Sequence, residues 1–367
     1  MESKITFGRW EMTALIINAI SVQAFLNYPR GMVETAGTAG WMIPVYTTGL
    51  TALIFFVITR LYKGFEGKDI LDIAQAAGGG FGRIITGLLL LVQIGFIVAI
   101  ILREFGEDMK VIALTNSPIS FVLFFFLGGM ILAAYTGLES ITRLMAIAVP
   151  LILFGLLIIL FGASPNYDLS NLAPILGNGL PSIAGGITKV SAFSSLIALF
   201  ILAPYIKTHK NFTRSGYWAI LLSGIILLLS TVAYEAAFPY PAALESFIPI
   251  YSLARLINFG RFFQRVESVF VLVWAMSALL YLSVGFFLLL HILRKTFRLE
   301  YYKPLILPLA VILFTVSLLP PNLMDAVVLE TKVFRNVAWV IPFGFTILLL
   351  LIARIRKGRK RKEAVHS

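Results

Sequence analysis

The stretch QAFLNYPRGMVETAG (residues 23–37) interrupts the first long apolar segment of the chain. It contains a proline and two glycines, which are poor helix formers, and the polar residues Asn27, Arg30 and Glu34. Inside a bilayer no water satisfies free backbone groups, so a helix breaks only where protein or a wet cavity surrounds it. The stretch therefore predicts either an interrupted spanning helix or a helix that ends near Asn27.

The composition identifies a membrane protein. Of the 367 residues, 59% are hydrophobic and only 13% are charged, and the mean hydropathy is +0.92. Soluble domains carry about 25% charged residues. Such an excess of apolar side chains cannot be buried in one water-soluble core, which excludes a soluble enzyme.

Several chemistries are excluded by residue type. The chain has no cysteine, and its three histidines, His209, His291 and His366, show no metal-ligand spacing. Neither a GxxxxGK[ST] phosphate loop nor a GxSxG nucleophile motif is present. We therefore expect no enzymatic activity, no cofactor and no metal.

Apolar runs of bilayer length predict an all-α membrane protein with about ten transmembrane helices. The expected spans are 9–36, 41–61, 82–105, 118–136, 141–162, 184–206, 214–238, 263–292, 303–320 and 336–355. Most of the 30 Lys and Arg residues then fall on one side, which predicts that both termini lie in the cytoplasm.

The last residues form a separate basic segment. RIRKGRKRKE (354–363) contains seven Lys or Arg residues and one Glu. Directly after an apolar span, this pattern is typical of a cytoplasmic anchor, and no nucleic-acid recognition module accompanies it. The sequence thus predicts one permease-like domain over 1–353, a basic tail over 354–367, and no nucleic-acid partner.

Three longer connections have distinct compositions. Residues 62–80 are polar and favour a cytoplasmic loop with a short amphipathic helix, whereas residues 163–183 contain no Lys or Arg and suit the outer face. Residues 239–261 are half apolar and indicate a short helix in the outer interface.

A ten-helix chain allows a five-plus-five inverted repeat in which helices 1 and 6 are both interrupted. The expected sixth helix begins GGITKVSAFSSLIALF (185–200), and its glycines and serines make it the weakest helix former among the spans. In helix 1 the break is assigned to Asn27, Pro29 and Gly31. Two interrupted spans five helices apart favour a binding site at mid-membrane, although a simple proline kink in helix 1 would also fit.

Charged residues within spans need partners because they are costly there. Arg103 and Glu107 have i,i+4 spacing at the outer end of the third span, and with Arg265 or Glu267 they predict a vestibule of paired charges. A solvated helix end is the alternative. Glu235 is expected near the outer end of the seventh span, where water can reach it.

Three stretches together carry a family resemblance: YPRG (28–31) followed by AGW (39–41), NLAPILGNGLPSIA (171–184) and GRFFQRVESVFVLVW (260–274). The chain resembles the endospore germination permeases, the B subunits of GerA-type nutrient germinant receptors, over essentially its whole length. The R-x-E-S-x5-W run of Arg265, Glu267, Ser268 and Trp274 is the most specific part.

The resemblance implies the fold of the amino acid–polyamine–cation transporter superfamily, with a LeuT-like inverted repeat. It also implies a place in the spore inner membrane, a small nutrient ligand such as an amino acid, and two partners: an A subunit and a lipoprotein C subunit. Carried over by position, the implied ligand pocket is formed by Val22, Gln23, Ala24, Ile97, Ser194, Ser195, Leu196, Ser277 and Tyr281.

The chain departs from the family pattern at two positions. Members often have Gly-x-Gly in the helix-1 break, where this chain has Val22-Gln23-Ala24, and Gly-x-Glu in helix 6, where it has Leu196-Ile197-Ala198. These side chains occupy space that the backbone would otherwise offer to a ligand, which weakens the assignment of a zwitterionic amino acid as the ligand. A nutrient-sensing subunit, a proton-coupled amino acid or amine transporter and a non-binding scaffold subunit therefore all remain open.

Overall fold

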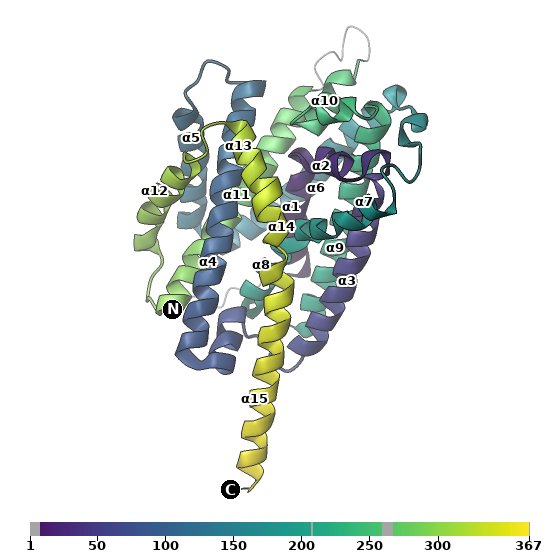
Figure 1. Ribbon diagram of the computed structural model, residues 1–367. Helices are drawn as coiled ribbons and strands as arrows, with labels where there is room; N and C mark the ends of the chain where they lie inside the picture. The colour runs from purple at the N-terminus through teal and green to yellow at the C-terminus, as the bar shows by residue number, and fades with distance from the viewer. Residues whose placement is uncertain (1–7, 207, 259–266, 367) are drawn as a thin grey trace.

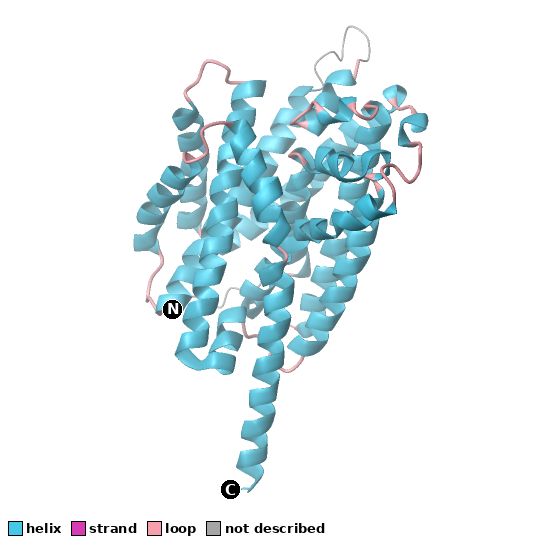
Figure 2. Ribbon diagram, in the orientation of Figure 1, coloured by secondary structure: helices cyan, strands magenta, loops and turns pink. Residues whose placement is uncertain are grey.

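The described part of the chain consists of helices and loops. The computed structural model describes residues 8–206, 208–258 and 267–366, and no strand occurs in these ranges (Figure 2). Eight helices there are long and apolar enough to cross a membrane: Met42–Tyr62, Ile70–Ile112, Ile119–Thr136, Leu138–Asn166, Leu180–Ile201, His209–Ala237, Glu267–Phe297 and Leu323–Gly358. The prediction of an all-α, multi-pass membrane protein is confirmed, whereas the count of ten spans and the orientation stay predictions.

The first expected span is two helices. α1 (Arg9–Phe25) lies at the centre of the bundle, and every residue from Met12 to Phe25 is buried. A helix that is apolar on all sides belongs in the interior of a bundle. α2 (Tyr28–Ala36) follows after a break, and a single 3₁₀ turn, η1 (Gly37–Ala39), leads to α3 (Met42–Tyr62).

α4 is longer than the span that we expected at 82–105. It extends from Ile70 to Ile112 and contains one non-helical residue, Gly79, whose φ of +67° bends the chain. An L side chain rarely adopts that φ, so glycine is required at the bend. The part before Gly79 is the short amphipathic helix predicted for residues 62–80, and the part after it crosses the bundle.

The sixth expected span is also interrupted. α5 (Ile119–Thr136) and α6 (Leu138–Gly162) precede it, and two short 3₁₀ turns, η2 (Ser164–Asn166) and η3 (Leu169–Leu172), lie in the connection. The span itself consists of α7 (Leu180–Gly185), the 3₁₀ segment η4 (Gly186–Leu196) and α8 (Ile197–Ile201), with the turn η5 (Ala203–Tyr205) at its end.

α9 (His209–Ala237) packs against α1 and α3. A 3₁₀ turn, η6 (Ala242–Leu244), and a short helix, α10 (Pro249–Leu256), follow, which confirms a short helix in residues 239–261. Glu235 is buried and not exposed to water. One of its carboxylate oxygens accepts a hydrogen bond from the Trp41 backbone N–H over 3.3 Å. The expectation of a solvated Glu235 was therefore wrong.

The C-terminal helices differ most from the expected spans. α11 (Glu267–Phe297) is followed by the 3₁₀ turn η8 (Lys303–Leu305) and α12 (Ile306–Ser317). The last helix begins at Leu323 rather than at residue 336, and it contains two π-helical segments. Its parts are α13 (Leu323–Val328), η9 (Leu329–Phe334), α14 (Arg335–Val337), η10 (Val340–Phe345) and α15 (Thr346–His366).

The two ends of the bundle differ. α2, α7 and α10 gather at one end, and α15 extends beyond the bundle at the other end and carries the basic tail (Figure 1). We call the latter the basic end. There the Lys357 ammonium donates to the Gly64 carbonyl oxygen over 2.7 Å, and Ser215 Oγ in α9 donates to the Arg9 carbonyl oxygen over 3.1 Å.

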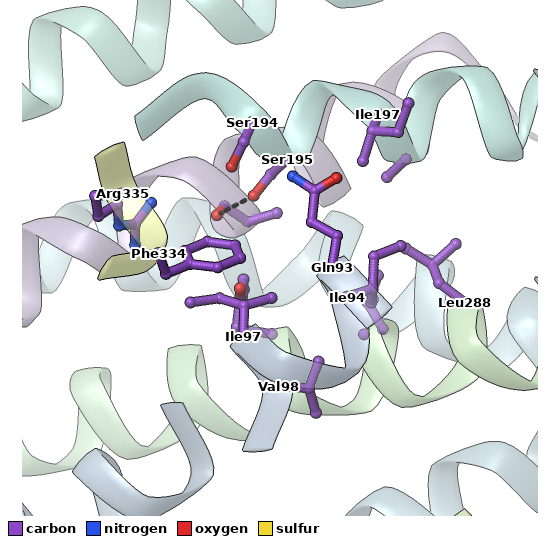
Figure 3. A pocket seen from close by; sticks show the side chains of 15 residues that line it. Gln93, Ile94, Ile97, Val98, Ser194, Ser195, Ile197, Leu288, Phe334 and Arg335 are labelled. Carbon is purple, nitrogen blue, oxygen red and sulfur yellow. Dashed lines mark hydrogen bonds between the residues drawn. The ribbon is translucent and has the colours of Figure 1, made fainter. Parts of the chain in front are cut away.

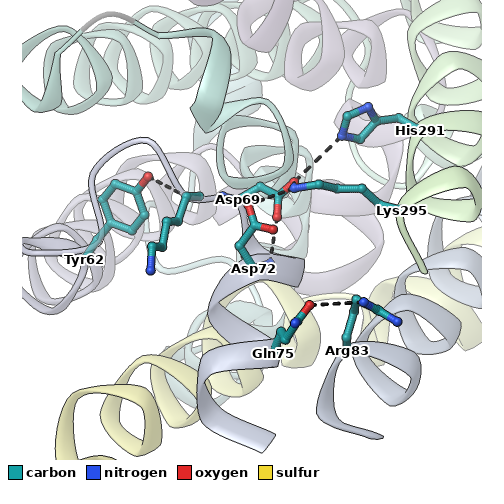
Figure 4. Close-up of polar contacts among 8 residues, drawn as sticks. Tyr62, Asp69, Asp72, Gln75, Arg83, His291 and Lys295 are labelled. Atoms are coloured by element: carbon teal, nitrogen blue, oxygen red, sulfur yellow. Dashed lines mark hydrogen bonds and ion pairs between the residues drawn. The ribbon is translucent and has the colours of Figure 1, made fainter. Parts of the chain in front are cut away.

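A buried carboxylate ties α4 to α11 at the basic end (Figure 4). Asp69 caps α4 in a reciprocal capping box with Asp72, and Lys295 forms ion pairs with both. His291 Nε2 lies 3.8 Å from an Asp69 oxygen. Burial acts to raise the pKa of Asp69, but the His291 contact and the Lys295 charge outweigh it and lower that pKa below its usual range.

Candidate functional site

The break in the first span lies at Leu26 and Asn27. Pro29 has no N–H and its ring excludes the carbonyl oxygen four residues earlier, that of Phe25, so α1 ends there. Asn27 precedes α2, Pro29 lies in its first turn, and the Gly31 N–H donates to the Asn27 carbonyl oxygen over 2.9 Å. Of the three residues assigned to the break, Asn27 lies at it, and Pro29 and Gly31 start the next helix.

The break in the sixth span is a change of helix type. Residues 186–196 form eleven residues of 3₁₀ helix, whereas runs beyond three or four residues are uncommon. Serine competes with the backbone for hydrogen bonds, and glycine is entropically unfavourable in an α-helix. Gly186 also has no room for a side chain, since a Cβ would lie 2.7 Å from the Tyr46 hydroxyl oxygen.

Two hydrogen bonds join the interrupted spans. The Gln23 Nε2 amide donates to the Ala192 carbonyl oxygen over 2.6 Å, and Ser195 Oγ donates to the Ala19 carbonyl oxygen over 3.0 Å. Both bonds cross from α1 to η4. The Gln23 amide thus provides an internal hydrogen-bond partner for the η4 backbone beside the helix-1 break.

The first cavity, which we call the inner cavity, lies between α1, α4, η4, α8, α11 and α14 (Figure 3). Its volume is about 50 Å³, which corresponds to a few water molecules. Its walls are mainly apolar, with polar groups from Gln93, Ser194, Ser195, Tyr281 and Arg335. A ligand larger than these waters requires side chains to move.

The second cavity, which we call the polar cavity, lies beside the helix-1 break and has a volume of about 30 Å³. Lys189, Glu330 and Arg335 are its charged residues. Three polar atoms of its lining residues, Asn27 Oδ1, the Tyr28 hydroxyl oxygen and Ser191 Oγ, are buried and have no hydrogen-bond partner in the described part of the chain. Buried polar atoms of this kind are normally paired, so a small polar ligand or water would satisfy them.

Arg335 lines both cavities. Its guanidinium pairs with Glu330, five residues earlier in the same helix, and its Nη1 is 3.5 Å from the Ser191 carbonyl oxygen. The π-helical segment η9 comes directly before it and shifts the register of the helix. The side chain therefore connects the last helix to the interrupted sixth span between the two cavities.

The structure separates the expected ligand residues into groups. Ile97, Ser194, Ser195 and Tyr281 line the inner cavity, and Gln23 lines the polar cavity. Three others, Val22, Ala24 and Leu196, are buried in packing and line neither cavity. Ser277 forms two hydrogen bonds with Asn18. The Ser277 Oγ donates to Asn18 Oδ1 over 2.9 Å, and Asn18 Nδ2 donates to the Ser277 carbonyl oxygen over 3.1 Å.

The cavity residues absent from the sequence-based set include Gln93, Glu330, Phe334 and Arg335. The last three lie before residue 336, where we expected the final span to begin. One signal could have found them, because Glu330 and Arg335 are two of the four charged residues in a helical stretch that already starts at Leu323. Five-residue spacing on a π-helix does not match the i,i+4 rule that we applied.

Arg103 and Glu107 of α4 form an ion pair and do not form a solvated helix end. Arg103 is buried, its Nη2 lies 2.8 Å from a Glu107 oxygen, and the same nitrogen donates to the Pro321 carbonyl oxygen over 3.0 Å. The alternative of a solvated end was therefore wrong, and the i,i+4 pair is confirmed. Glu267 begins α11, but Arg265 lies outside the described residues, so their part in a vestibule stays a prediction.

The comparisons with known proteins agree with this architecture. The profile of the family described as "Spore germination protein" matches residues 7–326, so the chain belongs to that family. Curated relatives in Bacillus subtilis (strain 168) include spore germination protein A2, 23% identical over 88% of this chain and 88% of the relative. Another is spore germination protein YndE, 23% identical over 98% of both chains.

Solved structures show the same fold at low identity. The nucleobase-cation-symport-1 family transporter Mhp1, in a closed conformation with bromovinylhydantoin bound, has a TM-score of 0.68 at 14% identity and covers 94% of this chain and 78% of that one. MhsT in complex with L-phenylalanine has a TM-score of 0.70 at 13% identity, with 94% and 88% covered. The chain thus has the fold of LeuT-type transporters.

Proposed function

We propose that this chain is the membrane-embedded subunit of a nutrient germinant receptor in the spore inner membrane, acting with an A subunit and a lipoprotein C subunit. The observation that carries the proposal is the position of Arg335 between two small cavities at the interrupted helices. A ligand that enters there contacts η4, α1 and the last helix at once. Its binding would favour one arrangement of these segments, which is the change that partner subunits read.

The polar cavity favours a ligand that carries a carboxylate. Lys189 and Arg335 provide two cationic side chains against the single carboxylate of Glu330. Asn27 Oδ1 and the Glu330 carboxylate are acceptors for an ammonium group, and Ser191 Oγ can donate or accept. These groups suit a small zwitterion such as an amino acid, even though the Gly-x-Gly and Gly-x-Glu patterns are absent.

Secondary transport is the second candidate. Both structural neighbours are of a transporter fold, and their descriptions include a bound small molecule. Fold alone does not separate a receptor from a transporter. The distinguishing observation is ligand flux: a receptor responds to the ligand without net uptake, whereas a transporter accumulates it.

The test measures dipicolinate release from spores that depend on this receptor, across a panel of amino acids and related nutrients. Ser195→Phe fills the inner cavity, and Ser140→Phe introduces the same change at an exposed position on α6. We expect one nutrient to trigger release, Ser195→Phe to abolish it, and Ser140→Phe to respond like the parent. Protein level and assembly with the partner subunits are measured in the same spores.

Each outcome decides between the candidates. If Ser195→Phe assembles normally and responds like the parent, the inner cavity is not used, and the chain is a scaffold or binds its ligand in the polar cavity alone. If labelled nutrient accumulates in vesicles that contain the purified chain, transport replaces the receptor proposal. A Ser195→Phe chain that fails to assemble is replaced by Ile97→Phe, which fills the same cavity from α4.

A further inference from the structure

A third cavity lies at the basic end, between the end of α3 and the start of α9. Its volume is about 420 Å³, several times that of the inner and polar cavities. Its lining comes from both helices and consists of Phe56, Thr59, Arg60, Lys63, His209, Thr213 and Tyr217. We call it the α3–α9 cavity.

The charge of this cavity is positive. Arg60 and Lys63 are exposed at its rim, and none of its lining residues is acidic. The acidic residue next to it, Glu66, lines a separate cavity on the other side of His209. α9 has 29 residues and begins at His209, so the partial positive charge of its N-terminus adds to the cationic side chains.

Two buried polar atoms in the cavity lack partners. His209 Nδ1 and Thr213 Oγ1 form no hydrogen bond within the described part of the chain. The imidazole is held in place by Tyr62 and Phe212, whose ring centres lie 6.1 Å and 6.3 Å from it. A fixed imidazole and a hydroxyl one turn apart can both donate to the oxygens of one bound anion.

The cavity continues into a face with exposed apolar side chains. Leu53, Phe56 and Arg60 follow one another at helical spacing on α3, and Leu53 is 67% exposed. On α9, Thr213, Tyr217 and Leu221 follow one another at i,i+4 spacing, and Leu221 is 48% exposed. The Arg60 guanidinium lies 5.0 Å from the centre of the Phe56 ring. Cationic groups thus lie at one end of an apolar strip.

We propose that the α3–α9 cavity is a binding site for an anionic phospholipid. Its phosphate lies between Arg60, Lys63, His209 and Thr213, and an acyl chain lies along Phe56, Leu53 and Leu221. Basic pockets between helices on the cytoplasmic side are suited to anionic headgroups, and each Lys or Arg near the surface strengthens binding about fivefold. The acyl strip distinguishes a lipid from a free anion.

The experiment titrates the purified full-length chain in detergent with phosphatidylglycerol or phosphatidylcholine and counts bound lipid by native mass spectrometry. We expect phosphatidylglycerol to bind at least about tenfold more tightly. Arg60→Gln/Lys63→Gln should weaken its binding about twentyfold, and Thr213→Val, which keeps the net charge, about threefold. The matched control is Arg354→Gln/Arg356→Gln, which removes two exposed charges from α15 and should change binding less than twofold.

Three results would overturn the proposal. Equal weakening by the α15 control shows diffuse attraction to the whole basic end. Unchanged binding in both Thr213→Val and Arg60→Gln/Lys63→Gln shows that the lipid binds elsewhere. Displacement of the lipid by millimolar inorganic phosphate shows a site for a free anion. Thermal unfolding of each variant without lipid confirms that the chain is folded.

Discussion

The Gln23 side chain of α1 lies 2.6 Å from the Ala192 carbonyl oxygen of η4, a hydrogen bond across 169 positions of sequence. It joins the two interrupted spans at the level of their breaks. The Ala192 carbonyl oxygen therefore has an internal partner instead of water or a ligand.

Replacing Gln23 should leave the Ala192 carbonyl oxygen buried without a donor. An unsatisfied buried acceptor costs about 1–3 kcal/mol, so Gln23→Met should lower the free energy of unfolding by about 2 kcal/mol. The measurement is thermal unfolding of the purified chain in detergent. Gln75→Met is the control, because Gln75 bonds Arg83 at the surface and its loss should change stability by less than about 0.5 kcal/mol. Equal effects would show that the Gln23 bond does not hold the breaks together.

Glu330 and Arg335 should behave as a buried pair. Removing one partner of such a pair leaves an uncompensated charge and costs about 3–5 kcal/mol, whereas removing both is much less harmful. We expect Arg335→Met and Glu330→Gln each to destabilise the chain, and Arg335→Met/Glu330→Gln to recover part of that loss. A double-mutant cycle by thermal unfolding measures the coupling. Simple additivity of the two losses would contradict the pairing.

Close packing of α9 on α3 depends on Gly216. A Cβ at this position would lie 2.1 Å from the Phe55 ring, which is itself enclosed by Phe200, Phe212 and Tyr217. Gly216→Ala should therefore destabilise the chain by about 1–3 kcal/mol. Gly49 on α3 has no neighbour within 4 Å, so Gly49→Ala should be neutral or slightly stabilising. A stable Gly216→Ala variant would show that the Phe55 ring can move aside.

The Asp69 carboxylate should make stability depend on pH at the basic end. Its pKa is lowered in the folded chain, so the ionised form stabilises the fold above the ordinary Asp pKa of about 4. That stabilisation is lost as the pH falls from about 4 through the lowered pKa. Asp69→Asn keeps a side chain that can cap α4 but removes the charge that pairs with Lys295.

We expect Asp69→Asn to lose about 2 kcal/mol at pH 7 and to show a flatter loss of stability below pH 4 than the parent. Unfolding curves at pH 3, 5 and 7 measure both effects. An Asp72→Asn variant is the control, because Asp72 is 41% exposed and its pairing with Lys295 contributes less. Parallel pH profiles for the parent and Asp69→Asn would exclude Asp69 as the titrating group.

The breaks could be predicted from sequence because they have local causes. Pro29 ends α1 by its own geometry, and the glycines and serines after residue 185 weaken an α-helix wherever they occur. The short helix at Pro249–Leu256 was predicted from the half-apolar composition of residues 239–261. The start of the last helix was missed, because Glu330 and Arg335 read as a polar loop until the fold pairs them.

The site was only partly predictable. Ile97, Ser195 and Tyr281 were assigned to one pocket by position from the family resemblance, and all three line the inner cavity. Arg335 reaches the cavities through a π-helical register and through packing of the last helix against η4. Neither is encoded in a local pattern.

The eleven residues of η4 also set how much the sixth span would shorten if this segment became α-helical. A 3₁₀ helix rises about 2.0 Å per residue and an α-helix about 1.5 Å, so rewinding the segment would shorten it by about 5 Å. The same change removes about 20° of rotation per residue, which adds up to roughly half a revolution over the segment. One end of the sixth span would then approach the other by about the pitch of a single helical turn and would rotate relative to it. Spin labels on α7 and α8 would register the approach as a shorter distance.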